Sequence, residues 1–178
     1  VTDDPAIILK ADRLLLPGVG AFAACMAGLK ARKGVLEAIE HVALVEHRPF
    51  LGICVGMQLL ASKGLEFGES DGLGWIPGEV APFKPSTEFR APHMGWNKVS
   101  AVSHHPVFEG LDEEVFYFAH SFHFKVENDA HNICVAKHGI EISAVVGRDN
   151  ILGCQFHPEK SQRAGLAFLS NFLTWSPA

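Results

Sequence analysis

The residues best suited to covalent chemistry centre on Cys54, which stands between Gly52 and Gly56. An apolar run precedes them and Met57 to Leu60 follow, so this segment is predicted to turn from a strand into a helix. The spacing is that of a nucleophile elbow, whose central residue has a strained backbone and whose flanking glycines avoid a clash. The pattern predicts a cysteine nucleophile, with a thiolate favoured by unpaired N–H groups and the dipole of the helix.

A cysteine nucleophile needs a base, and the base usually needs a partner that orients it. The best candidates are His157 and Glu159, which follow a predicted strand from Ile151 to Phe156. Both would lie at the end of that strand, where open α/β sheets place their sites. Residues two apart in an extended chain point the same way, so Glu159 is expected to hold the imidazole of His157.

Two further features suit acyl transfer. Gln58 lies four residues after Cys54, on the same helix face one turn later, and could reach a bound substrate. The backbone N–H of Val55 and the turn from Pro17 to Gly20 are the predicted donors of an oxyanion hole. Each motif alone has a plainer interpretation, such as a buried structural cysteine, a loop histidine or a simple turn. Their occurrence together, in an order that fits one sheet, favours the catalytic interpretation.

The elements that must position these residues alternate between strand and helix in the first half. Strands are predicted over 11–16 and 49–53, and helices over 21–46, divided at Gly28 and Gly34, and over 55–63, ending at Gly64. The stretch 72–97 is rich in Gly and Pro and predicts loops and short strands. Further strands are predicted over 115–120, 133–137, 142–146 and 151–156, and a last helix over 164–173. Turns at His138-Gly139 and Asp149-Asn150 favour antiparallel pairing, and so a mixed sheet in an α/β domain.

Composition narrows the class of protein. With 48% hydrophobic and 20% charged residues among 178, the chain has the balance of a globular protein with a substantial core. Its apolar runs are far shorter than a membrane span, and no secretory signal is expected. A net charge of -5 without a basic cluster argues against a nucleic-acid surface. The four cysteines form no C-x-x-C pair, so a reducing, cytoplasmic location is expected.

The histidines raise the question of a metal site. His104 and His105 are adjacent, and His120 precedes His123 by three residues. In one alternating strand His120 would share a face with the phenylalanines of that segment, and His123 would lie on the other face. No metal and no cofactor are therefore predicted, and His120 is expected to be a packed residue or part of a pocket wall.

The chain resembles class I, triad-type glutamine amidotransferases in two segments, Gly52–Gln58 and His157–Ser161. More narrowly, it is similar to the glutaminase subunits of imidazole glycerol phosphate synthase, from histidine biosynthesis. The narrower resemblance rests on four segments: Leu16–Phe22, Pro92–Asn97, Tyr117–Ser121 and Gln155–Ser161. Pro92–Asn97 is the most specific of them, because the elbow and the His-Pro-Glu segment also occur in glutaminases that serve other synthases.

The resemblance implies a single three-layer α/β domain over 1–178, with a mixed, largely parallel central sheet and an antiparallel portion in its second half. It implies a triad of Cys54, His157 and Glu159 that hydrolyses glutamine to glutamate and ammonia. The implied oxyanion donors are Val19 and Val55. The implied glutamine-binding residues are Gly20, Gln58, Ser121 and Phe122.

The resemblance also implies a partner, a (β/α)8-barrel cyclase subunit that receives the ammonia through a channel in a heterodimer. The implied interface residues, in a Gly- and Pro-rich loop, are His93, Met94, Trp96 and Asn97. Trp and Met are enriched at interface cores, although by residue type alone a self-packed, buried Trp96 is the alternative.

The chain departs from the family's pattern at its start. Members usually begin with a strand, a glycine-containing loop and a helix, whereas Val1–Lys10 resembles the second strand-and-turn region. The chain is therefore expected to lack this unit and to have an unpaired sheet edge.

Other functions stay open on the residues alone. The alternatives are a glutaminase for another synthase, a γ-glutamyl hydrolase, and a non-catalytic regulatory subunit of the same fold. Pro92–Asn97 argues against the first two, and the intact Cys54, His157 and Glu159 argue against the last.

Overall fold

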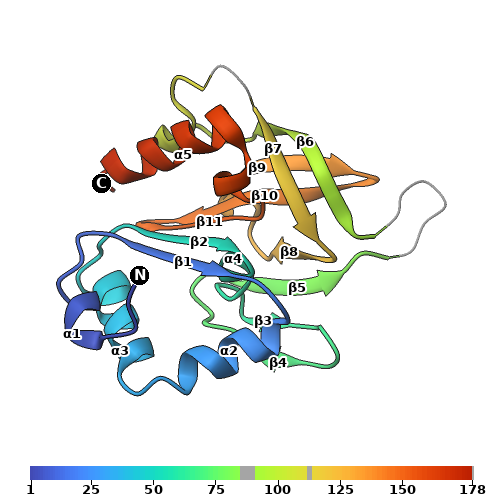
Figure 1. Ribbon diagram of the computed structural model, residues 1–178. Coiled ribbons are helices and arrows are strands. Elements are labelled where there is room, and N and C mark those ends of the chain that lie inside the picture. Colours follow the sequence, from blue (N-terminus) through green and yellow to red (C-terminus); the bar gives the residue numbers. More distant parts are fainter. Residues whose placement is uncertain (85–90, 112–113, 178) are drawn as a thin grey trace.

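The computed structural model describes residues 1–84, 91–111 and 114–177 (Figure 1). Part of the predicted loop region 72–97, residues 85–90, lies outside this description. The described chain builds a seven-stranded sheet in the order β1-β2-β11-β10-β9-β6-β7. A smaller four-stranded sheet has the order β4-β3-β5-β8.

The large sheet is mixed, as predicted, but it is not largely parallel, because four of its six strand pairings are antiparallel. Its parallel part is β1 (Leu14–Gly18), β2 (Phe50–Cys54) and β11 (Ile151–Cys154). Its antiparallel part, the larger among the described strands, is β10 (Ile140–Arg148), β9 (Asn132–His138), β6 (His93–Ala101) and β7 (Val115–His120). The tight turns after His138 and Arg148 connect the antiparallel neighbours as the sequence predicts.

The small sheet is formed by β3 (Lys63–Gly64), β4 (Ser70–Asp71), β5 (Gly78–Pro82) and β8 (Phe122–Val126). The chain bends at Ser121, between β7 of the large sheet and β8 of the small one. The prediction of one alternating strand through His120 and His123 is therefore wrong. Each strand buries its own set, so Phe116, Phe118 and His120 are buried from β7, and His123 and Phe124 from β8.

Helices cover both faces of the large sheet (Figure 1). On one side of β1 and β2 lie α1 (Pro5–Ile8), α2 (Phe22–Lys30), α3 (Val35–Glu40) and a π-helical turn, His41–Val45. On the other side lies α5 (Gln162–Thr174). The helix α4 (Val55–Gln58) follows β2, and single 3₁₀ turns span Pro106–Phe108, Asp129–His131 and Pro158–Lys160. This is the expected three-layer arrangement.

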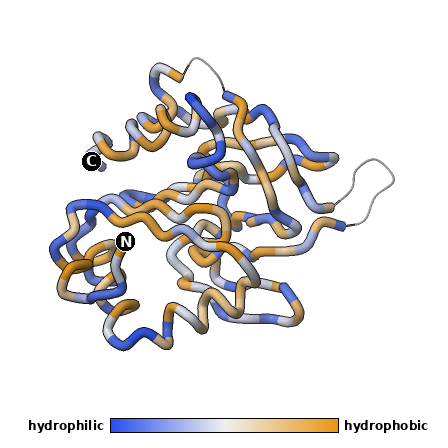
Figure 2. Tube along the Cα trace, viewed as in Figure 1, coloured by the Kyte–Doolittle hydropathy of each residue, from blue (hydrophilic) through white to orange (hydrophobic). Residues whose placement is uncertain are grey.

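Strands β2 and β11 are buried along their whole length, because helices cover both faces of a parallel sheet. Figure 2 shows the corresponding concentration of hydrophobic residues in the interior of the large sheet. Their continuous apolar runs explain why these two strands are predicted at nearly their observed positions.

Three predicted elements differ from the structure. Val1–Lys10 contains a helix, α1, because the Asp4 side chain caps it and Pro5 suits its first position. Gly28 lies inside α2, and the break spans residues 31–34, where Gly34, with a φ of 79°, precedes α3. The helix after Cys54 ends at Gln58, and Gly64 belongs to β3.

Within the described residues, no helix combines the length and the apolar character needed to cross a bilayer.

Candidate active site

Cys54 occupies the turn between β2 and α4 with φ 56° and ψ -111°. A positive φ is unfavourable for a residue with a side chain, so the strained conformation predicted for the elbow is present. The cysteine is buried at the carboxyl end of β2, in the middle of the parallel part of the sheet.

The two flanking glycines are needed because α4 lies against the backbone of β1 and β2. A Cβ atom at Gly56 would stand 1.8 Å from the carbonyl oxygen of Leu16, and one at Gly52 would stand 2.4 Å from the carbonyl oxygen of Gly56. No real Cβ tolerates such distances, so both positions exclude every other residue type without a backbone shift. The glycines of the motif thus set how closely the nucleophile's turn packs.

His157 and Glu159 interact as predicted, although the backbone between them is not extended. The Nδ1 atom of His157 lies 2.8 Å from Oε1 of Glu159. Strand β11 ends at Cys154, and Pro158–Lys160 is a 3₁₀ turn, so the turn and not strand periodicity brings the carboxylate to the ring. The imidazole is buried while Glu159 is half exposed. Because Nδ1 faces the carboxylate, Nε2 is the nitrogen left for proton exchange.

The backbone of His157 is held from two sides. Its N–H donates to the carbonyl of Tyr117 on β7 at 2.8 Å, and its carbonyl accepts from the Ser161 hydroxyl at 2.6 Å. The register pairs Ile53 of β2 with Cys154 of β11, so Cys54 and His157 emerge at the same sheet edge. This edge is where open α/β sheets place their sites.

Gln155 is a site residue that the chemical reasoning missed. Its side-chain Nε2 lies 3.8 Å from the sulfur of Cys54, and its Oε1 accepts a hydrogen bond of 3.0 Å from Gln58. Gln155 is fully buried. A glutamine directly after an apolar strand and two residues before the candidate base was the available signal.

The other predicted site residues divide into two groups. Gln58 reaches Phe122, whose carbonyl accepts from Gln58 Nε2 at 3.2 Å, while Ser121 is exposed beside it. On the other side Gly18 pairs in register with Cys54, which places the 17–20 turn next to the elbow. Val19 is 76% exposed, and its carbonyl accepts a 3.4 Å hydrogen bond from the Cys25 thiol. Gly20 has a φ of 109°, which glycine adopts readily.

A comparison with known families matches nearly the whole chain. The model of the family described as "Glutamine amidotransferase class-I" matches residues 2–175. The chain belongs to the class-I glutamine amidotransferase family. Curated relatives are "Imidazole glycerol phosphate synthase subunit HisH" of Cereibacter sphaeroides, 49% identical over 99% of this chain and 84% of the relative, and of Zymomonas mobilis, 50% identical over 99% and 83%. The HisH relative from Caulobacter vibrioides is 50% identical over 99% of this chain and 84% of its own.

Solved structures agree on the fold of this amidotransferase. The crystal structure of a glutamine amidotransferase superposes with a TM-score of 0.67 at 18% identity, covering 97% of this chain and 85% of its own. A putative GMP synthase component from Thermoplasma acidophilum gives 0.62 at 24% identity, covering 96% and 75%. At these identities the likeness concerns the fold alone.

The electrostatics of the amidotransferase site differ from the sequence-based expectation of a resting thiolate. Burial raises the pKa of the Cys54 thiol to about 11, and the nearby Glu159 also raises it. A hydrogen bond from the Val55 N–H and the charge of Lys160 act in the opposite direction but are outweighed. The single turn of α4 is too short to offset the burial.

We therefore expect the Cys54 thiol of the free chain to react slowly with iodoacetamide at pH 7 and faster as the pH approaches 11. The thiolate is the reactive species, and with the pKa near 11 only a small fraction of it exists at neutral pH. Mass spectrometry of Cys54-containing peptides against pH measures this. An alkylation midpoint below pH 8 would show that the resting thiolate is stabilised after all.

The same raised pKa predicts a loss of stability at high pH. The thiol has an ordinary pKa of 9.0 and a folded-state pKa of about 11, so the folded protein holds this proton more tightly. The resulting contribution to stability is complete below pH 9 and is lost as the pH rises through 11.

The four implied interface residues do not lie in a loop, and two of them are not exposed. Residues 93–97 form part of strand β6. Met94 and Trp96 are 65% and 50% exposed, but His93 is buried and Asn97 is half-buried. Alternation along the strand explains this, because His93 points inward where Met94 points outward. Trp96 rests edge-on against the ring of Tyr117 on β7, at 5.9 Å between centroids.

The histidines of β7 and β8 pack in one aromatic cluster. The rings of His120 and His123 both contact Phe83, with centroids 5.4 and 5.0 Å from it. The expectation that they occupy opposite faces is wrong, while the expectation that His120 is a packed residue is confirmed. Among the described residues, no three His, Cys, Asp or Glu side chains form a group able to hold a metal.

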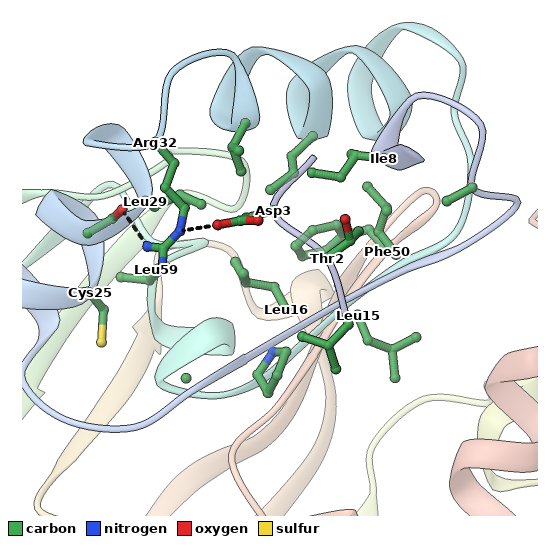
Figure 3. Close-up of a pocket in the computed structure, with 18 of the residues that line it drawn as sticks. Thr2, Asp3, Ile8, Leu15, Leu16, Cys25, Leu29, Arg32, Phe50 and Leu59 are labelled. Carbon is green, nitrogen blue, oxygen red and sulfur yellow. Dashed lines mark hydrogen bonds and ion pairs between the residues drawn. The ribbon is translucent and has the colours of Figure 1, made fainter. Parts of the chain in front are cut away.

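A large cavity lies beside β1, between that strand and the segments around α1, α2 and α3. It has a volume of about 980 Å³ and mostly apolar walls, with Leu15, Leu29 and Leu59 among its lining residues (Figure 3). The ion pair between Asp3 and Arg32, at 3.3 Å, lies at its border. Neither Cys54 nor His157 lines this cavity, but Gly18 and Val19 of the turn beside the elbow do.

Proposed function

We propose that this amidotransferase is the glutaminase subunit of an imidazole glycerol phosphate synthase and acts in histidine biosynthesis. The observation that carries the proposal is the combination of HisH relatives near 50% identity over almost the whole chain with a strained Cys54 at the same sheet edge as the His157–Glu159 pair. Family membership alone would not show which synthase this glutaminase serves.

We infer that Cys54 is the nucleophile, His157 the acid and base, and Glu159 the residue that orients His157. Because the thiol is protonated at rest, its proton passes to His157 Nε2 as sulfur attacks the side-chain amide carbon of glutamine. The C–S bond forms, and His157 returns the proton to the amide nitrogen as the C–N bond breaks and ammonia leaves. His157 then deprotonates a water that attacks the thioester, which releases glutamate and restores the thiol.

Charge on the amide oxygen during both attacks needs hydrogen-bond donors. We assign this role to the backbone N–H groups of Val55 and Val19. The Val55 N–H already faces the sulfur, and the exposed turn containing Val19 borders the elbow. Gly20, Gln58, Ser121 and Phe122 are proposed to hold the glutamine.

The proposed partner is a (β/α)8-barrel cyclase subunit that forms a heterodimer with this chain. Ammonia is protonated in neutral water and loses its nucleophilicity, so direct transfer through a shielded channel preserves its reactivity. Met94 and Trp96 are large apolar side chains exposed on one face of β6, which supports placing the partner there. His93 and Asn97 lie along the same strand, more deeply buried.

Glutamate release from glutamine tests this function. It is measured with the chain alone, with the cyclase subunit, and with the cyclase subunit carrying a ligand in its site. Release that rises steeply only with the liganded cyclase is the expected result. Release that is independent of the cyclase would favour a stand-alone hydrolase or another synthase, and would contradict the proposal.

A Trp96→Ala variant is expected to weaken association with the cyclase by at least tenfold, or about 1.4 kcal/mol, because buried interface Trp residues carry much of the binding energy. Half of the Trp96 side chain is exposed in the free chain, so the free energy of unfolding should change much less than the free energy of binding to the cyclase. Titration calorimetry and thermal melting measure the two effects. Unchanged affinity would place the interface elsewhere.

A further inference from the structure

The carbonyl of Phe122 is held by two side chains from different directions. Gln58 Nε2 donates to it at 3.2 Å, and Nδ1 of His120 lies 2.7 Å from it. Gln58 also donates to Gln155, whose own amide lies against the sulfur of Cys54. His120 and Gln58 therefore contact the same carbonyl group, and Gln58 connects that carbonyl through Gln155 to the sulfur of Cys54.

The hydrogen-bond partners of His120 determine which of its nitrogens carries the hydrogen. A carbonyl only accepts, so Nδ1 of His120 donates to Phe122 and Nε2 of the neutral ring is an acceptor. The Nδ1 atom of His93, 2.9 Å from that Nε2, must then be a donor. The remaining nitrogen of His93, Nε2, accepts from the Asn97 amide at 3.0 Å.

Asn97 determines the direction of the whole series. Its amide also donates to the carbonyl of Lys137 at 3.0 Å, so its nitrogen is oriented toward two acceptors. Every bond from Asn97 through His93 and His120 to Phe122 therefore runs in one direction. Reversing any ring would place two donors or two acceptors against each other.

Burial favours the neutral rings that this arrangement needs. His93 and His120 are 3% and 6% exposed, and His93 is stacked between Phe118 and His138, with centroids at 4.5 and 4.2 Å. Burial is also the main reason why the pKa values of His93 and His120 are lowered to about 4 and about 3. Both rings are therefore uncharged at neutral pH, as the hydrogen-bond directions require.

We propose that His120 is a positioning residue for glutamine: its Nδ1–H holds the Phe122 carbonyl against Gln58, while His93 and Asn97 fix the tautomer that makes this possible. The proposal rests on the proposed glutaminase function, because Phe122 and Gln58 are there assigned to the substrate site. It also connects strand β6, next to exposed Trp96, with the residues beside Cys54.

Two isosteric replacements of His120 separate positioning from a structural role. The amide nitrogen of asparagine can occupy the place of Nδ1, whereas that of glutamine occupies the place of Nε2. In the complex with the cyclase subunit, His120→Gln is expected to raise the KM for glutamine about tenfold with kcat within about twofold, because uniform substrate binding is lost. His120→Asn keeps the donor to Phe122 and is expected to leave KM within about threefold of wild type.

Both variants remove the same buried ring, so equal melting temperatures and unequal KM values support positioning. Equal KM changes in the two variants, or no change in either, would overturn the proposal.

Nitrogen NMR of histidine-labelled wild-type chain gives a test that needs neither catalysis nor a variant. His120 and His93 are both expected as Nδ1–H tautomers, and an Nε2–H form of His120 would overturn the proposal. If the wild-type complex releases no glutamate, the proposed function is refuted. The NMR tautomers of His120 and His93 alone then test the hydrogen-bond directions around Phe122.

Discussion

Replacing Cys54 with alanine should abolish glutamate release from the cyclase complex, by a factor of at least about 10⁴, because no other group at the elbow can form the thioester. The side chain is small and its loss leaves the glycine-flanked turn intact, so complex formation should persist. The strained φ of 56° is as unfavourable for alanine as for cysteine, so it gives no reason for a refolded turn. Glutamate assays and titration of the cyclase subunit measure the two properties.

Cys134→Ala is the matched control for this experiment. Cys134 is fully buried in β9, and its replacement removes one sulfur from the core without touching the elbow. It should lower the melting temperature but leave glutamate release within about twofold of wild type. If Cys54→Ala lost cyclase binding as well as activity, Cys54 would have a structural role and the proposed mechanism would fail.

The parts of the site that the sequence predicts are those set by local pattern. The flanking glycines of Cys54 predict a turn that only they can form, and the apolar runs of β2 and β11 predict buried neighbours in a sheet. The contact between His157 and Glu159 is predicted correctly, but through the wrong geometry. A separation of two residues brings the groups together in a 3₁₀ turn as well as in a strand.

The parts that differ depend on contacts distant in sequence. Helical propensity favours a helix from Val55 to Lys63, but N–H groups of the loop that follows bond to the carbonyl groups of residues 59–61. The N–H groups of Leu73, Gly74 and Ile76 bond to the carbonyls of residues 59, 61 and 60, at 2.7, 2.9 and 3.0 Å. These bonds end the helix after one turn, and no local sequence pattern predicts them.

The charge state of the nucleophile could not be predicted for the same kind of reason. A cysteine at a helix start suggests a stabilised thiolate, but the effect of burial depends on every element packed around Cys54. Gln155, which faces the sulfur, and the ring pair of His93 and His120 likewise come together only through the pairing of strands.

Replacing Gly56 with alanine should lower the free energy of unfolding by about 3 kcal/mol, or prevent folding altogether, because the elbow has no space for a methyl group. The added Cβ would stand 1.8 Å from the carbonyl oxygen of Leu16. That atom belongs to the backbone of β1, whose parallel pairing with β2 fixes its position. Relief would therefore require α4 to move off the sheet, which would also displace Cys54.

Gly28→Ala provides the opposite control, since it makes the same chemical change without the crowding. Gly28 lies inside α2, and a Cβ there meets nothing within 4 Å. Alanine is the better helix former, so this variant should gain roughly 0.5–1 kcal/mol. Urea unfolding followed by circular dichroism compares the two variants with wild type. A Gly56→Ala protein as stable as wild type would mean that α4 can leave the backbone of β1 at little cost. The close approach would then no longer explain why glycine stands beside the nucleophile.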